Sequence, residues 1–236
     1  MISKIFHGLY YHENTKTNRV AMNRIIYDKY DKKSITKLPK VEFQGKIRVV
    51  VNEQEAEKAV DYLLSCDLLG VDTETRPSFK KGKQNVVALL QVANDEICFL
   101  FRLNLTGLTP AIIRFLEDTT VPKVGLSLHD DMLSLSKRGE FTPGNFIDLQ
   151  DHMTELGIQD LSLQKLYANI FHEKISKTQQ LSNWEADILS DRQKIYAATD
   201  AWACIKLYRE YLRMIAANDY ELQITEEDEC EEVTDK

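Results

Sequence analysis

Short apolar runs and helically spaced apolar positions alternate along the middle of the chain. Residues 48–51 and 68–72 are short, mainly apolar runs of the length typical of strands, and the second run ends in an acid. Between them, Asn52 and Glu55 form a helix start of the capping-box type, and apolar residues then recur at the spacing of one helix face. The pattern therefore predicts a strand, a helix and a strand in succession.

Further strands and helices follow in a regular order. Residues 85–92 and 96–101 flank the turn residues Asn94 and Asp95, which predicts an antiparallel hairpin. The remaining predicted elements are a helix at 109–117, a strand at 123–126, a helix at 129–137, a strand at 145–148, a helix at 161–170 and a long helix at 190–217. A hairpin followed by strand–helix alternation predicts a single α/β domain, in which helices pack on the faces of a mixed sheet.

Composition excludes several classes of protein. The chain has 236 residues, of which 43% are hydrophobic, so it can bury a sizeable core and is too apolar for general disorder. It has no apolar run near the ~18 residues of a membrane helix, and its first residues lack the features of a signal peptide. The four cysteines are far apart, as is typical of unpaired thiols in a reducing compartment, so we expect a cytoplasmic protein with no membrane partner.

The formal charge of −7 is unevenly distributed along the chain. Residues 1–45, the basic lead, carry +5, residues 46–218 carry −4, and residues 219–236, the acidic tail, carry −8. We expect a disordered tail, because it has little apolar surface to offset the entropy of ordering. The lead mixes tyrosines with cations, which suits single-stranded nucleic acid, but a partly ordered lead that wraps on the domain 46–218 is the more ordinary interpretation.

The first candidate site is a pair of acids at the end of a predicted strand. Side chains alternate along a strand, so Asp72 and Glu74 point to the same face. Two adjacent carboxylates repel one another, and a divalent cation would relieve that repulsion. Taken alone, the pair is more typical of a solvated strand end.

Two more acidic features lie further along the chain. Asp130 and Asp131 begin the helix after the strand at 123–126, where acids commonly complement the helix dipole. Tyr196 and Asp200 are four residues apart on the last long helix and therefore share a face. An amphipathic helix with an incidental acid is the alternative for this last pair.

The order of these features is more specific than any one of them. An Asp-x-Glu strand, an acid at a strand–helix junction and a late Tyr-x-x-x-Asp helix resemble the DEDD superfamily of 3′-5′ exonucleases, in its tyrosine-containing subgroup. The resemblance is closest to the ribonuclease D and Werner-type exonuclease domains. It covers residues from about 46 to 215 and includes the segments 87–91 and 181–184.

The resemblance implies a fold, a reaction and a set of ligands. The fold is RNase H-like, with a mixed five-stranded sheet flanked by helices. Asp72, Glu74, Asp131 and Asp200 would hold two divalent cations, Mg²⁺ or Mn²⁺, with Asp130 one register step from Asp131. The reaction would release nucleoside 5′-monophosphates from a 3′ end. Because a tyrosine is mostly neutral at pH 7, Tyr196 would orient the attacking water and not remove its proton.

The expected partner is the single-stranded 3′ end of DNA or RNA. Candidate substrate-binding residues are Thr73, Leu128, Leu133, Lys177 and Trp184, with Lys174 as a further phosphate contact. Surface lysines of this kind are usually only solvated, and a tryptophan in the loop 177–185 is commonly a packing residue.

Two alternatives to a free-standing nuclease stay open. One is a catalytically silent nucleic-acid-binding module that acts through the basic lead. The other is a subunit of a DNA-repair or RNA-processing complex, in which the two end segments are docking arms. Ribonuclease D chains continue into helical nucleic-acid-binding domains, whereas here an acidic tail follows the last helix, so we expect a stand-alone nuclease domain.

Overall fold

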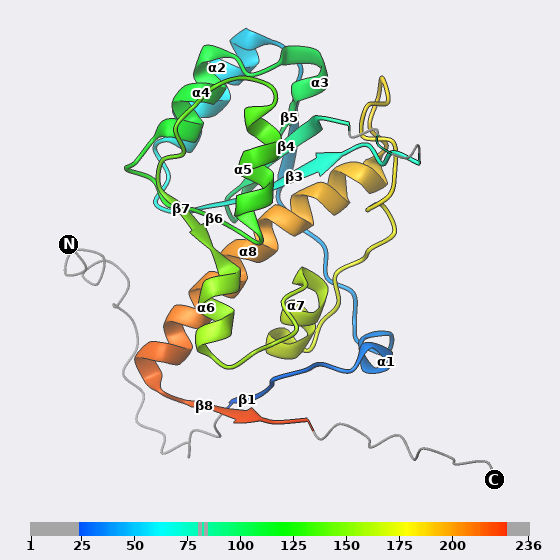
Figure 1. The fold of residues 1–236 in the computed structure, drawn as a ribbon, viewed down its shortest axis with the longest axis vertical. Helices are drawn as coiled ribbons and strands as arrows, with labels where there is room; N and C mark the ends of the chain where they lie inside the picture. The colour runs from blue at the N-terminus through cyan, green and yellow to red at the C-terminus, as the bar shows by residue number, and fades with distance from the viewer. Residues whose placement is uncertain (1–23, 80–81, 83–84, 226–236) are drawn as a thin grey trace.

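The computed structural model describes residues 24–79, 82 and 85–225, which form a six-stranded mixed sheet flanked by helices (Figure 1). The strands are, in sheet order, β2 (Lys46–Val50), β5 (Ile97–Arg102), β4 (Val87–Ala93), β3 (Leu69–Thr75), β6 (Lys123–Gly125) and β7 (Phe146–Asp148). β4 is antiparallel to both of its neighbours, and the other pairs are parallel. The predicted α/β class and the hairpin are confirmed, with six strands where the resemblance implied five.

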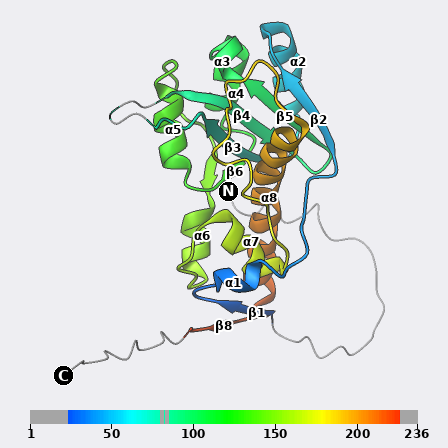
Figure 2. The same ribbon diagram turned by 90° about the vertical axis from the view of Figure 1, so that its right-hand side faces the viewer.

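Helices cover both faces of this sheet. α2 (Glu53–Leu63) and α4 (Pro110–Glu117) pack on one face, where the buried side chains include Val71, Leu90 and Val92. The long helix α8 (Asp191–Ala217) crosses the opposite face and continues beyond it, as Figures 1 and 2 show. The other helices are α1 (Lys32–Ile35), α3 (Leu103–Thr106), α5 (Leu128–Ser136), α6 (Leu149–Glu155) and α7 (Leu163–Phe171).

The predicted helix starts are confirmed by their caps. Asn52 accepts a hydrogen bond from the Glu55 amide at the start of α2. Ser190 and Gln193 form a reciprocal capping box at the start of α8. These side chains satisfy backbone donors that have no partner inside the helix, so the helices begin where the sequence pattern predicts.

α8 approaches the sheet closely because small residues face one another there. A Cβ atom added to Gly70 of β3 would lie 1.9 Å from the carbonyl oxygen of Ala201, which no side chain permits. Ala197, Ala198 and Ala201 are buried against the same face of the sheet. This contact brings the middle of α8 down onto β3, the strand that carries the first pair of acids.

The two ends of the described chain pair with one another below the sheet (Figure 2). β1 (Arg24–Tyr27) and β8 (Tyr220–Gln223) form a parallel two-stranded sheet, and Ile26 of β1 is fully buried against α6, α7 and α8. The prediction of a disordered tail is therefore wrong for residues 219–223, because the lead supplies a partner strand that the tail's own composition does not reveal. The lead and tail predictions also cover residues 1–23 and 226–236, which lie outside the described residues.

Within the described residues, no helix is both long enough and apolar enough to cross a lipid bilayer.

Candidate active site

Three carboxylates meet where α8 crosses β3. Asp72 and Glu74 are two residues apart on β3 and face α8, as strand alternation predicts. Asp200 is buried on α8 above them. Each of the three offers a carboxylate oxygen, and these atoms all lie within 4.8 Å of one another. The close approach at Gly70 is what brings the helix acid to the strand acids.

A fourth acid reaches the cluster from α5. The Thr73 hydroxyl donates a hydrogen bond to Asp131 Oδ1, which ties the first turn of α5 to β3. Asp130, the alternative in the sequence, is exposed to solvent. The structure therefore brings Asp131 to the other acids, and not Asp130.

Asp148 holds the start of α5 in place. It ends β7 and accepts hydrogen bonds from the backbone amides of Ser127 at 3.0 Å and Leu128 at 2.7 Å. Sequence reasoning missed this role, although an acid at the end of a strand was visible. What the sequence does not show is that β7 lies directly beside β6, which places Asp148 next to the loop that begins α5.

Burial and mutual repulsion raise the pKa values of these acids. The pKa of Asp72 lies well above its usual range, first because of burial and then because of the charges on Asp131 and Asp200. Burial raises the pKa of Glu74 to about 10, and the charge on Asp72 is the next largest cause. The two strand acids therefore bind protons strongly whenever no cation compensates for them.

The other two acids are shifted less because neighbouring donors oppose the burial. The pKa of Asp131 rises to about 6, with burial as the cause and the Thr73 hydroxyl acting against it. The pKa of Asp200 rises to about 7, again through burial, while the Tyr196 hydroxyl and the Lys177 ammonium lower it. Burial is thus the largest influence at all four acids.

The donor set fits a divalent cation. Asp200 Oδ1 is buried and has no hydrogen-bond partner among the described residues. Carboxylate oxygens are hard ligands of the kind that Mg²⁺ and Mn²⁺ prefer, and positive charge at this point would remove the repulsion that raises the pKa values. A resident cation would explain both the unsatisfied oxygen of Asp200 and the clustering of the three acids.

Tyr196 lies one helical turn before Asp200 on the same side of α8. Burial is the main cause that raises the pKa of its hydroxyl, and the neighbouring Asp200 and Glu74 carboxylates raise it further. Tyr196 is therefore a neutral hydroxyl at any physiological pH, able to donate one hydrogen bond and accept others.

Three of the four acids, Asp72, Glu74 and Asp200, line a cavity of about 320 Å³. Its walls come from β3, from the two residues before α5, from the start of α7, from α8 and from the loop before α8. The lining residues are Asp72, Thr73, Glu74, Leu126, Ser127, Leu161, Ser162, Leu163, Gln164, Ile175, Ser176, Lys177, Gln180, Tyr196, Asp200 and Cys204. Of the predicted substrate-binding residues, Thr73 and Lys177 line this cavity, and the Thr73 hydroxyl is already engaged by Asp131.

The other predicted substrate-binding residues lie elsewhere. Trp184 is 0% exposed and packs with its ring centroid 6.0 Å from that of Tyr196, so it cannot stack on a base in this conformation. Leu128 is a core residue at 5% exposure, whereas Leu133 is 54% exposed on α5 and does not line the cavity. The Lys174 ammonium donates a hydrogen bond to the carbonyl oxygen of Thr36, and this contact holds the lead against the domain.

Comparison with known proteins adds a family match and distant relatives. The family model described as 3′-5′ exonuclease matches residues 47–216. The chain is 28% identical over 183 residues to the bifunctional 3′-5′ exonuclease/ATP-dependent helicase WRN of Mus musculus, covering 73% of this chain and 13% of that protein. It is 28% identical over 187 residues to a 3′-5′ exonuclease of Arabidopsis thaliana, covering 72% of this chain and 65% of that protein. The chain thus spans less than two thirds of either relative.

Solved structures share the fold at low sequence identity. The exonuclease domain of Nibbler from Aedes aegypti superposes with a TM-score of 0.68 at 18% identity, covering 77% of this chain and 95% of that one. Ribonuclease D of Escherichia coli gives a TM-score of 0.65 at 17% identity, covering 73% of this chain and 46% of that one.

Proposed function

The chain belongs to the 3′-5′ exonuclease family, and from this premise we propose that it hydrolyses phosphodiester bonds at the 3′ end of single-stranded DNA or RNA, releasing nucleoside 5′-monophosphates. The observation that carries the proposal is the convergence of buried acids from two distant segments on one point of an open cavity. Structural ion pairs do not account for this cluster, because within the described residues Asp72, Glu74 and Asp200 form no salt bridge, although the Lys177 ammonium lowers the pKa of Asp200.

In this proposal Asp72, Glu74, Asp131 and Asp200 hold two divalent cations, Mg²⁺ or Mn²⁺. When bound, such cations lower the pKa of water to near neutrality and offset the charge of the phosphate. The protein's own contribution is to fix the four carboxylates. Thr73 orients Asp131 through its hydroxyl, and Asp148 orients the helix turn from which Asp131 projects.

Tyr196 positions the attacking water. Its raised pKa excludes a role as a general base at neutral pH, whereas a neutral hydroxyl beside Asp200 can hold a water by hydrogen bonding. Lys177 lines the same cavity and, as a cation near Asp200, is placed to contact the substrate phosphate.

The test is to incubate 5′-labelled single-stranded DNA, and its RNA equivalent, with the protein and Mg²⁺ or Mn²⁺. We expect stepwise shortening with release of 5′-monophosphates, and we expect chelator or the Asp72→Asn substitution to abolish it. Asp151→Asn, which changes an exposed acid of α6, is the matched control and should cut normally. An intact strand that the protein binds tightly and in a salt-sensitive manner would instead indicate the silent nucleic-acid-binding module.

A further inference from the structure

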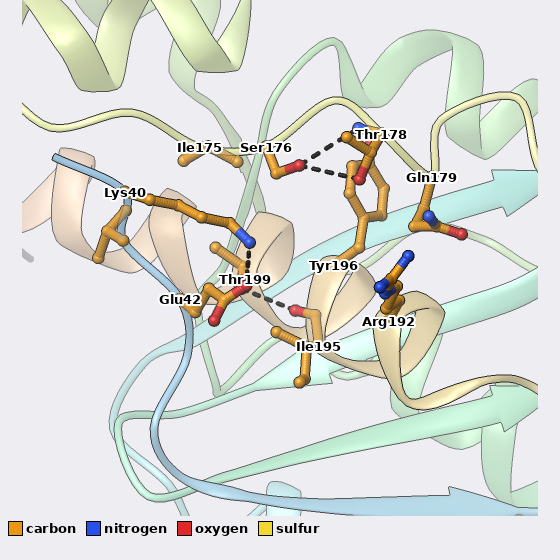
Figure 3. A pocket seen from close by; sticks show the side chains of 11 residues that line it. Lys40, Glu42, Ile175, Ser176, Thr178, Gln179, Arg192, Ile195, Tyr196 and Thr199 are labelled. Atoms are coloured by element: carbon orange, nitrogen blue, oxygen red, sulfur yellow. Dashed lines mark hydrogen bonds and ion pairs between the residues drawn. The ribbon is translucent and has the colours of Figure 1, made fainter. Parts of the chain in front are cut away.

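A second cavity lies on the other side of Tyr196 (Figure 3). Its volume is about 380 Å³. Tyr196, Ile175 and Ser176 line both this cavity and the one that holds the acids. The remaining lining residues are Lys40, Val41, Glu42, Thr178, Gln179, Arg192, Ile195 and Thr199. The two cavities are therefore neighbours, separated by the Tyr196 side chain and the segment 175–180.

The segment before α8 serves both cavities. Lys177 and Gln180 line the cavity with the acids, whereas Thr178 and Gln179 line the second one. The lead completes the second cavity, where the Phe43 amide donates to the Thr199 hydroxyl at 3.0 Å and so fixes residues 40–42 against α8. The second cavity is thus built from three separate parts of the chain.

The two cavities differ in charge. The first contains three acids and Lys177, whereas the second contains Lys40, Arg192 and Glu42. Lys40 forms an ion pair with Glu42, so the charge of Lys40 is already compensated. The side chain of Arg192 forms no hydrogen bond or ion pair with any described residue, which leaves its guanidinium available to an anion.

Arg192 also stands at an unfavourable place for helix stability. It is the second residue of α8, and a cation in the first turn of a helix opposes the helix dipole. In Figure 3 its side chain points from α8 toward Gln179, beside the Tyr196 ring. Hydroxyl groups of Ser176 and Thr178, 3.0 Å apart, and the Gln179 amide add neutral donors around the same space.

We propose that this second cavity binds a phosphate group of the substrate strand, on the 5′ side of the bond that is cut, with Arg192 as its main cationic contact. This rests on the proposed function. When a 3′-terminal nucleotide is removed, the leaving nucleotide carries no phosphate beyond the scissile one, so every other phosphate of the strand lies on the 5′ side. A neighbouring cavity that offers an uncompensated guanidinium and hydroxyl donors is where the next phosphates would bind.

The proposal gives Arg192 a length-dependent role. A dinucleotide without a terminal phosphate has a single phosphodiester, which must occupy the cavity with the acids. Longer strands have a second phosphate to place beyond Tyr196. Binding there would also hold the strand across the Tyr196 ring, which sets the position of the scissile bond relative to the Tyr196 hydroxyl.

The test measures kcat/KM for single strands of two, three, four and six nucleotides. We expect Arg192→Ala to lower kcat/KM roughly five-fold for three nucleotides or more, and to leave the dinucleotide unchanged. The matched control is Lys194→Ala, which removes a cation of the same helix that pairs with Asp191 and lines neither cavity. The control should change none of the four values, and both variants should melt as the wild type does.

Binding of a longer labelled strand in the presence of chelator gives a readout that does not need hydrolysis. For a single strand, loss of one phosphate contact should reduce the slope of log affinity against log salt by about 0.7. A protein that never shortens any strand contradicts the proposed function. Even then, the effect of Arg192→Ala on the salt dependence of strand binding still tests whether the second cavity binds a phosphate. Equal losses at all lengths, or losses matched by Lys194→Ala, would overturn the inference. The inference would also be overturned if free phosphate or a nucleoside 5′-monophosphate bound in a manner that depends on Arg192, while Arg192→Ala left the binding of the strand unchanged.

Discussion

At the scale of one residue, the buried charge of Asp200 lowers the stability of the fold. Its carboxylate is buried, one of its oxygens has no hydrogen-bond partner among the described residues, and its pKa is raised to about 7. A folded-state pKa above the unfolded value means that the folded protein binds the proton more tightly. The protonated Asp200 carboxyl therefore contributes its full stabilisation below about pH 4, and this contribution is lost as the pH rises towards 7.

Asp200→Asn should accordingly stabilise the metal-free protein at pH 8, by roughly 1 to 3 kcal/mol, because the cost of the buried charge disappears. Near pH 4 the two proteins should unfold alike, since the wild-type carboxyl is then protonated. Urea unfolding in chelator at both pH values measures the difference. Asp151→Asn, at an exposed site, should change neither value, and an Asp200→Asn protein that is less stable at pH 8 would contradict this account.

Tyr196→Phe should slow hydrolysis without weakening the binding of divalent cations. The substitution removes only the hydroxyl to which we assign the orientation of the attacking water, so we expect kcat to fall by about 10²-fold. Mn²⁺ affinity, measured by calorimetry, should stay within about two-fold of wild type, because no carboxylate is lost. Equal losses in turnover and in Mn²⁺ affinity would indicate that the hydroxyl instead supports the acids.

The acids of the site were predictable because short local spacings determine how they point. Asp72 and Glu74 follow the two-residue period of a strand, and Tyr196 and Asp200 the four-residue spacing of a helix. Trp184 was not predictable in the same way. Whether a large aromatic residue in a loop is exposed or buried depends on which elements lie above it, and here it is buried against the Tyr196 ring.

At the scale of elements, one buried acid adds to the pairing of the end strands β1 and β8. Asp28 follows β1 and accepts hydrogen bonds from the amide and hydroxyl of Thr225, which follows β8. The Gln159 side chain also donates to Asp28, at 3.4 Å. The two hydrogen bonds from Thr225 lower the pKa of Asp28, with the Thr225 hydroxyl as the largest cause, so the junction is strongest when Asp28 is ionised.

Asp28→Asn should therefore loosen β8 while leaving the sheet intact. We expect faster hydrogen exchange for the backbone amides of residues 220–225, because the amide side chain accepts these bonds less well than a carboxylate. Exchange in β3 and β4 should not change. Glu221→Gln, at an exposed position of β8, is the control and should exchange at the wild-type rate.

Pairing of β1 with β8 could not be predicted from the sequence. The main strands have strong apolar patterns, and neighbours such as β4 and β5 are joined by a short turn. By contrast, Asp28 and Thr225 are 197 positions apart, and β8 lies in a segment with few apolar residues. Strands of this kind are stabilised by a distant partner, which no local pattern contains.

At the scale of the whole molecule, the domain is larger than the segment 46–218 that the sequence pattern delimits. Ile26, Ile35 and Phe43 of the lead are buried against the rest of the domain. Their burial alone is worth on the order of 5 kcal/mol, at roughly 1.5–3 kcal/mol per large apolar side chain. Lys40 and Glu42 also bring the lead to the wall of the second cavity.

A chain shortened to residues 46–218 should thus be less stable than one of residues 24–225, by several kcal/mol in chemical unfolding. Within the full chain, Ile26→Ala should reproduce part of this loss. Ile25→Ala, at an exposed position of the same strand, should not. Equal stability of the two shortened chains would show that the lead only lies on the surface.

Net charge is a poor guide to the partner of this protein. The total of −7 includes −8 from the acidic tail, and the four proposed ligands account for a further four negative charges. Two divalent cations would add four positive charges at the acids, beside a second cavity with an uncompensated Arg192. The surface that faces a nucleic acid can therefore be electropositive in a protein that is acidic overall.

We expect the acids gathered from β3, α5 and α8 to carry out the hydrolysis. Asp131 and Asp130 offer the sharpest comparison, because they are adjacent and chemically identical, and only Asp131 is hydrogen-bonded to β3. The measurement is the rate at which a 5′-labelled single strand shortens from its 3′ end with Mg²⁺ at pH 8. We predict that Asp131→Asn lowers this rate by about 100-fold or more, while Asp130→Asn stays within about two-fold of wild type. Equal rates for the two variants, or a larger loss in Asp130→Asn, would contradict the account.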